Sequence, residues 1–250
     1  MRSNRPSDVA GEPVVIGSPF QGPPGSANGG YVSGLLARHL TPGPVRITLR
    51  RPVPLDQQLV IAGAGSETVA LMGPGDAGAD GEVLAEASAC QSVDVGQIPD
   101  VDLETARHAE PDAELLRKHP FPHCFGCGPE RDPAEAVALH VGRVAGDVWG
   151  TTWTPSGALA SDGDVLAPEI ARTALDCPGS FAAVPAGAAP HVLGRLEGEV
   201  LRPLRVGQEH VVLAWPLGQE GRKRWAATAI LGPDGALSAH ARATWIALSS

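Results

Sequence analysis

The chain has 250 residues, of which 43% are hydrophobic, and its formal net charge at pH 7 is -9. That length and apolar content suffice for a sizeable core, in one large domain or in two smaller ones. Proteins that bind nucleic acids present basic surfaces and stacking rings, so the acidic balance and the 4% aromatic content argue against nucleic acid as a partner.

Targeting and cysteine content point to the cytoplasm. Residues 1–11 are polar, and no apolar run approaches the roughly 20 residues that span a bilayer, so we expect neither a signal peptide nor a membrane partner. The four cysteines are too few and too scattered for a disulfide framework in a chain this long. We expect a cytoplasmic protein with reduced thiols.

The first predicted helix covers residues 30–39, where apolar side chains recur at helical spacing before a Pro-Gly pair at 42–43. Strands are predicted within residues 49–58 on both sides of a Pro-marked turn, and at 59–64. A Gly-Pro-Gly-Asp turn at 73–76 precedes an extended segment at 82–95. Such turn residues are typical of hairpins, so we expect antiparallel sheet.

Residues 97–122 are acidic and punctuated by proline, and they are predicted to form a connector with one short helix near 112–118. Two strands, 139–143 and 148–153, are expected on either side of a Gly-Asp turn. The Gly-, Ser- and Asp-rich segment 155–164 is expected to be a loop.

The second predicted helix covers residues 167–176, with Pro168 and Glu169 in its first turn and a Pro-Gly pair at 178–179 after it. Apolar strands are predicted at 210–215 and 225–231. A Gly-Pro-Asp-Gly turn at 232–235 then leads to a last strand at 237–248.

An internal repeat links the two halves. Residues 49–58 (LRRPVPLDQQ) are echoed by residues 200–209 (VLRPLRVGQE), an offset of 151 (202 minus 51). Each copy follows a predicted helix and precedes hairpin strands. We therefore expect an α+β fold of two tandem units, residues 1–96 and 123–250, each a central helix wrapped by a bent antiparallel sheet.

Two motifs at the helix ends give this pattern a specific resemblance. Asn-Gly-Gly at 28–30 opens the first helix, and Ala-Leu-Asp-Cys-Pro-Gly at 174–179 closes the second. The combination resembles the hot-dog thioesterase superfamily, in its double hot-dog members. In phenylacetyl-CoA-type relatives, a His-Gly-Gly motif starts the central helix and an aspartate follows seven residues after the second glycine.

The two halves depart from that motif in complementary ways. In the first half Asn28 stands in place of the histidine, and Ala37 stands where the acid belongs. Aligning Ala37 with Asp176, an offset of 139 (176 minus 37), gives the second half the acid, but Ala-Pro-Glu at 167–169 in place of Asn-Gly-Gly. Since hot-dog sites combine the helix start of one unit with the acid of another, the resemblance implies one surviving composite site.

The resemblance implies hydrolysis of an acyl-CoA or related thioester at this site, with neither metal nor organic cofactor. The amides of Gly29 and Gly30 would hold the thioester carbonyl, and Asp176 would act as general base or nucleophile. Asn28 would orient the carbonyl or the water, and Thr173 would hold a water. Glu169 is the second-choice carboxylate. The simpler interpretation of Asn28 is a helix cap. The simpler interpretation of Glu169 is that the helix dipole and capping favour an acidic residue in the first helical turn.

Two other functions remain open from the sequence. A non-catalytic protein that binds acyl groups or small molecules is favoured by Ala37 and by the missing histidine. A hot-dog hydratase or dehydratase is less favoured, because no Asp/His pair lies near either helix start. A monomer and a homo-oligomer are both compatible with the fused repeat.

A Cys-x-x-Cys pair, Cys124 and Cys127, lies at the start of the second unit. His119, His123, Cys124 and Cys127 have the residue types of metal ligands, but zinc requires four ligands, and Cys177 and Cys90 are isolated in the sequence. A Cys-Phe-x-Cys-Gly segment is structural in the hot-dog thioesterases that the chain resembles, so the resemblance implies a structural role here, and we expect no metal.

Overall fold

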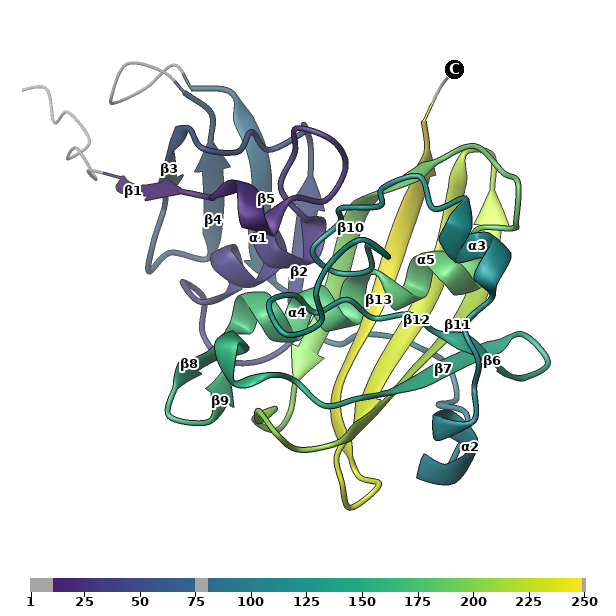
Figure 1. The fold of residues 1–250 in the computed structure, drawn as a ribbon. Coiled ribbons are helices and arrows are strands. Elements are labelled where there is room, and N and C mark those ends of the chain that lie inside the picture. The colour runs from purple at the N-terminus through teal and green to yellow at the C-terminus, as the bar shows by residue number, and fades with distance from the viewer. Residues whose placement is uncertain (1–10, 75–80, 249–250) are drawn as a thin grey trace, which may run out of the picture.

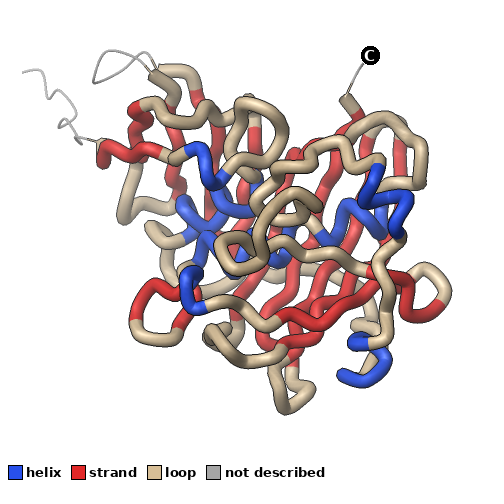
Figure 2. The backbone as a smooth tube through the Cα atoms, viewed as in Figure 1, coloured by secondary structure: helices blue, strands red, loops and turns tan. Residues whose placement is uncertain are grey.

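The computed structural model describes residues 11–74 and 81–248 of the chain (Figure 1). One antiparallel sheet of eleven strands dominates it, and the two longest helices, α1 (Gly29–Ala37) and α4 (Pro168–Asp176), lie side by side against that sheet. Figure 2 shows which segments of the backbone are helix, strand and loop. None of the helices within these described ranges has the length and apolar character needed to cross a membrane.

The strands of each half form a contiguous block of the sheet. In the first half the block runs β1-β3-β4-β5-β2, and in the second β10-β13-β12-β11-β7-β6. The first-half strands are β1 (Glu12–Val15), β2 (Val45–Leu49), β3 (Gln58–Ala62), β4 (Thr68–Met72) and β5 (Val83–Ala89). The second-half strands are β6 (Gly142–Ala145), β7 (Val148–Trp153), β10 (His191–Val200), β11 (His210–Glu220), β12 (Lys223–Leu231) and β13 (Leu237–Ala247).

The two blocks join where β2 pairs with β10, with Arg46 opposite Glu197. Outward from this junction the strand order is β2-β5-β4-β3-β1 on one side and β10-β13-β12-β11-β7 on the other. The two halves therefore repeat one strand order, with α1 before β2 and α4 before β10.

Two glycines on α1 set how closely the central helices approach. A Cβ atom on Gly30 would lie 2.6 Å from the Thr173 Cα atom, and one on Gly34 would lie 2.2 Å from the Glu169 Cα atom. Contacts this short are sterically forbidden, so only glycine allows the two backbones to meet there. Gly30 contacts the end of α4 and Gly34 contacts its beginning, so the two helices run antiparallel where they cross.

Each half has its own apolar core, and aromatic side chains join the two. Val32, Leu36 and Ile47 belong to the first core, and Leu175 and Leu196 to the second; each is fully buried. The ring of Tyr31 packs against both cores and stacks on Phe20 at a centroid distance of 4.0 Å. Burial of these side chains is the main stabilising contribution to the contact between the halves.

The segment that follows the first half crosses the outer surface of the second. Val95, Val101 and Ala106 pack against Trp215 and Leu213, and the Trp215 indole donates a hydrogen bond to the Val95 carbonyl at 3.0 Å. This segment carries α2 (Leu103–Arg107) as well as α3 (Ala113–Arg117). The short helix expected near 112–118 is present as α3, whereas α2 was not predicted.

Several elements differ from the sequence prediction. Strand β6 begins three residues later than expected, and β1, β4 and β10 were not predicted. Strands were predicted within residues 49–58 on both sides of the turn, but only Leu49, the last residue of β2, and Gln58, the first of β3, lie in strands there. The expected loop 155–164 contains a 3-10 turn (Gly157–Leu159) and part of a hairpin, β8 (Ala160–Asp162) and β9 (Val165–Leu166). The pair Pro178-Gly179 does not only end α4, because a new helix, α5 (Pro178–Ala183), starts there. Proline suits the first turn of a helix, so the same residue stops one helix and begins the next. Residues 75–76 of the turn predicted at 73–76 lie outside the described residues.

Candidate active site

The crossing of α1 and α4 brings the start of one helix to the carboxylate at the end of the other. The Gly30 amide donates a hydrogen bond to Asp176 Oδ2 at 2.8 Å. The approach depends on Gly30, since a Cβ atom there would lie 2.8 Å from the Asp176 Cβ atom. The two sequence motifs, separated by 146 residues, are thus in direct contact.

Asp176 is buried and only partly satisfied. Its side chain is 2% exposed, and no described residue donates a hydrogen bond to Oδ1. Burial raises the pKa of this carboxyl to about 8; the nearby Cys124 thiol also raises it, and the Gly30 amide lowers it. A buried carboxyl with one free oxygen at a cavity is typical of a functional position. Its burial lowers the stability of the folded state.

A cavity of about 470 Å³ lies beside this carboxyl. Its wall includes Asn28, Gly29 and Asp176, and most of the remaining wall is apolar, with Leu193, Phe181 and Trp245 among its residues. That volume lies within the range of sites for small organic molecules. The exposed charged residues that line it are Asp112, Glu114 and Lys118, so this part of the wall has a negative balance.

Gly29 presents a free backbone donor to the cavity. It is the first residue of α1, it lines the cavity, and no described residue accepts a hydrogen bond from its amide. A Cβ atom there would lie 2.8 Å from Leu193 Cδ2 and 2.9 Å from Leu49 Cδ1. A free amide at a helix start, reinforced by the helix dipole, suits a developing oxyanion.

Asn28 caps α1 and faces sulfur atoms. Its Oδ1 accepts a hydrogen bond from the Tyr31 amide at 2.9 Å, so the side-chain NH₂ group points the other way. Nδ2 lies 3.5 Å from both Cys124 Sγ and Cys177 Sγ. Asn28 is thus a helix cap, as the simpler interpretation has it, and also a donor to two thiols.

Thr173 and Glu169 lie away from the cavity wall. Thr173 Oγ1 donates to the Glu169 carbonyl at 2.8 Å and lies 3.3 Å from Asn28 Oδ1, so the hydroxyl is satisfied within the helix contact. The Glu169 carboxylate pairs with Arg38 at 2.9 Å, near the opposite end of that contact. Neither residue lines the cavity, and nor does Gly30. The structure therefore brings Asn28, Gly29 and Asp176 together at the cavity. The other three predicted residues, Gly30, Thr173 and Glu169, do not line it.

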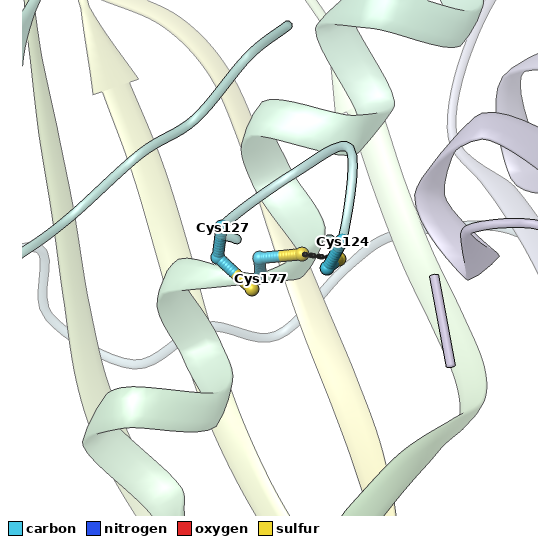
Figure 3. Close-up of side chains that lie close together, drawn as sticks. All are labelled: Cys124, Cys127 and Cys177. Atoms are coloured by element: carbon cyan, nitrogen blue, oxygen red, sulfur yellow. Dashed lines mark hydrogen bonds between the residues drawn. The ribbon is translucent and has the colours of Figure 1, made fainter. Parts of the chain in front are cut away.

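Three cysteines form a cluster next to this site (Figure 3). Cys124 and Cys127 come from the loop before the second half and Cys177 from the residue after Asp176. Their sulfur atoms all lie within 4.8 Å of one another, and Cys124 Sγ lies 3.9 Å from Cys177 Sγ. The prediction that Cys177 is isolated was wrong, because its partners lie about fifty residues away in the sequence and sequence spacing does not reveal them.

The environment of the cluster favours an ionised sulfur at Cys124. The pKa of the Cys124 thiol is well below its usual value because the thiols of Cys127 and Cys177 donate to it and the amides of Gly126 and Cys127 point at it; burial opposes this shift. The structure therefore gathers reduced, polarised thiols at the cavity wall.

Two histidines also reach the cavity wall; His191 was not singled out from the sequence, and His119 was considered there only as a metal ligand. His191 Nδ1 lies 2.7 Å from the Ala189 carbonyl, which identifies Nδ1 as its protonated nitrogen. His119 Nδ1 accepts from the Phe121 amide at 3.1 Å, and its Nε2 lies 3.4 Å from Cys127 Sγ. Burial lowers the pKa of His119. His123 is exposed and pairs with Glu130, away from the cluster.

Comparison with known proteins defines the fold. No model of a known protein family matches the sequence. No curated protein sequence matches it either. A conserved protein of unknown function with a hot-dog fold from Alicyclobacillus acidocaldarius is 12% identical with a TM-score of 0.61, and the match covers 98% of this chain and 96% of that one.

Two further solved structures resemble the chain over most of its length. The acyl-CoA thioesterase II TesB2 from Mycobacterium marinum is 15% identical with a TM-score of 0.54, and 89% of each chain is covered. A variant of the GphF dehydratase is 18% identical with a TM-score of 0.56, and the match covers 89% of this chain and 85% of that one. The chain therefore has the hot-dog fold.

Proposed function

We propose that the chain is a double hot-dog protein that hydrolyses an acyl thioester at one composite site between its two units. The units are residues 1–96 and 123–250, and residues 97–122 connect them. The shared strand order of the two halves supports the two units. One contact carries the proposal: the Asp176 carboxylate of one unit lies 2.8 Å from the Gly30 amide at the helix start of the other, beside a cavity.

In the proposed reaction, Gly29 and Asp176 have the two principal roles. The thioester carbonyl oxygen accepts a hydrogen bond from the Gly29 amide, which no described residue uses. Asp176 Oδ1 likewise has no partner among the described residues. In the ionised form of this carboxyl, whose pKa is about 8, Oδ1 takes a proton from water as the water oxygen bonds to the carbonyl carbon. The carbon–sulfur bond then breaks, and the proton passes from Asp176 to the leaving thiolate. The products are a carboxylic acid and a free thiol.

In the first half, the position that matches Asp176 carries no catalytic group. Ala37 ends α1 and carries no carboxylate, and Glu169 near the start of α4 is paired with Arg38. A mirror-image site would therefore lack both an acid and a free glycine amide. One active site per chain follows from this asymmetry.

The polarity and charge of the cavity wall bear on which thioesters can bind. Its apolar residues suit an acyl chain, whereas the exposed Asp112 and Glu114 outnumber Lys118 and repel a phosphorylated carrier. Thioesters of short, uncharged carriers should therefore be better substrates than acyl-CoA. The resemblance in fold to an acyl-CoA thioesterase supports the same reaction class.

A dehydratase is the second candidate, and one observation favours it. His191 lines the same cavity as Asp176, with Nδ1 held by the Ala189 carbonyl, so its Nε2 is an available base. No such pair is apparent near the helix starts in the sequence. A 3-hydroxyacyl thioester would be its substrate.

A substrate panel separates these functions. The purified chain is incubated with acyl-CoA, acyl-pantetheine and 3-hydroxyacyl thioesters, and free thiol and enoyl absorbance are followed together. Thiol release with any thioester supports the hydrolase. Enoyl formation without thiol release refutes it in favour of the dehydratase. Saturable calorimetric binding with no turnover on any substrate refutes it in favour of an acyl-binding protein.

A further inference from the structure

We propose that Cys124, Cys127 and Cys177 are the ligands of a Zn²⁺ ion at the wall of the cavity. Thiolate sulfur is a preferred ligand of zinc, and three protein ligands with one open position are typical of zinc sites that are not closed. The inference does not rest on the proposed hydrolysis, because it concerns metal binding by side chains to which the hydrolytic steps assign no role.

The sulfur geometry is close to that of a zinc site. Zinc–sulfur bonds of about 2.3 Å in a tetrahedron place neighbouring sulfur atoms about 3.8 Å apart. Cys124 Sγ and Cys177 Sγ are 3.9 Å apart, and all three sulfur atoms lie within 4.8 Å of one another. Binding therefore requires movements of less than about 1 Å, which side-chain rotation alone supplies.

Two glycines in the loop that carries Cys124 and Cys127 allow Cys177 to approach. A Cβ atom on Gly126 would lie 2.4 Å from Cys177 Sγ, so glycine between the two loop cysteines is what admits the third sulfur. A Cβ atom on Gly128 would lie 2.5 Å from the Cys124 backbone nitrogen, and the Gly128 amide donates to the Cys124 carbonyl at 2.8 Å. This tight turn fixes Cys124 and Cys127 on the same side of the loop.

Each sulfur atom also faces a nitrogen donor. Asn28 Nδ2 lies 3.5 Å from Cys124 Sγ and from Cys177 Sγ, and its orientation is fixed by the cap it forms on α1. His119 Nδ1 accepts from the Phe121 amide, so its proton is on Nε2, 3.4 Å from Cys127 Sγ. Donors of this kind orient thiolate ligands and stabilise their charge.

The tautomer of His119 also excludes it as the fourth ligand, because the nitrogen that faces the cluster carries the proton. All three cysteines line the cavity, which gives the ion an entry path and leaves its fourth position to water or to a bound molecule. With all three cysteines bound as thiolates, the resulting site has one net negative charge that the Asn28 and His119 donors offset.

Cobalt titration of the full chain tests the proposal. The reduced protein is freed of metal with a chelator and titrated with Co²⁺, whose thiolate charge-transfer and d–d absorption report tetrahedral sulfur coordination; Zn²⁺ is then added. We expect one equivalent of Co²⁺ to give both signals and Zn²⁺ to abolish them. No thiolate charge transfer in folded protein would overturn the proposal.

Matched variants identify the ligands. Cys177→Ser should lose the charge-transfer signal, whereas Cys90→Ser, which changes a cysteine outside the cluster, should keep it. Circular dichroism checks that each variant is folded. If Cys177→Ser misfolds, protection of thiols in the unaltered chain replaces it: Zn²⁺ should shield three of the four from a thiol reagent. Retention of the full signal in folded Cys177→Ser, or protection of only two thiols, would refute the three-cysteine site.

Discussion

Replacing Gly30 by alanine should weaken the contact that positions Asp176, whereas replacing its neighbour Gly29 should not. The two glycines are adjacent in the first turn of α1, so the pair controls for helix propensity and chain position. They differ in what an added methyl group would meet. At Gly30 the nearest atoms are backbone, 2.6 and 2.7 Å away on α4; at Gly29 the two nearest are the ends of leucine side chains, 2.8 and 2.9 Å away.

The distances set the expected magnitude. An ordinary contact is at least 3.4 Å, so alanine at 30 falls short by 0.8 Å (3.4 minus 2.6) and α1 must move away from α4. Over-packing of this kind costs about 1–3 kcal/mol. Helix propensity returns at most about 1 kcal/mol, and it does so equally in both variants. At Gly29 the Leu193 and Leu49 methyl groups can rotate away, so the free energy of unfolding should change by less than about 1 kcal/mol.

Urea unfolding of the two variants measures the difference directly. Gly30→Ala should have the lower free energy of unfolding by about 1–2 kcal/mol, because only its methyl group meets backbone atoms that cannot rotate away. Equal stabilities, or a less stable Gly29→Ala, would refute the reasoning from the helix contact.

Three further substitutions test other parts of the account by thermal or urea unfolding. Asn28→Ala removes the α1 cap and should lower the free energy of unfolding by about 0.5–2 kcal/mol; no change would show that the cap is unimportant. Arg172→Met should leave stability unchanged or raise it. Burial lowers the pKa of Arg172 to about 10, so its charge is unfavourable in the folded state at every pH below that value, and its one hydrogen bond, to the Gly198 carbonyl, is a partial offset. A loss above about 2 kcal/mol would contradict this. Arg107→Ala, which breaks an exposed pair with Glu209, should change stability by less than about 1 kcal/mol.

Local patterns in the sequence were sufficient to place the central helices and most of the strands. Turn residues and apolar spacing placed one helix at 30–39 and the other at 167–176, and the structure has α1 at Gly29–Ala37 and α4 at Pro168–Asp176. Elements with weak local signals were missed, such as α2, which is five residues long, and β1, where only four residues pair along the sheet edge. Such elements form because tertiary contacts stabilise them.

Only those residues of the candidate site that belong to a sequence motif could be predicted. Asn28, Gly29 and Asp176 were identified through their resemblance to the hot-dog thioesterase motif, and all three line the cavity. The cysteine cluster was not found, because proximity of Cys177 to the loop depends on how α4 packs, and a single sequence does not encode that contact in any spacing rule. The free amide at Gly29 and the occupied amide at Gly30 likewise became distinguishable only from the backbone geometry.

The measurement that tests the composite site most directly compares Asp176→Asn with Glu169→Gln on a thioester that the unaltered chain hydrolyses. Loss of a general base lowers turnover by about 10²–10⁴-fold, and that is the result expected for Asp176→Asn. Glu169→Gln changes the carboxylate that lies outside the cavity, so its turnover should stay within about threefold of the unaltered chain. Full turnover in Asp176→Asn, or its loss in Glu169→Gln alone, would contradict the account.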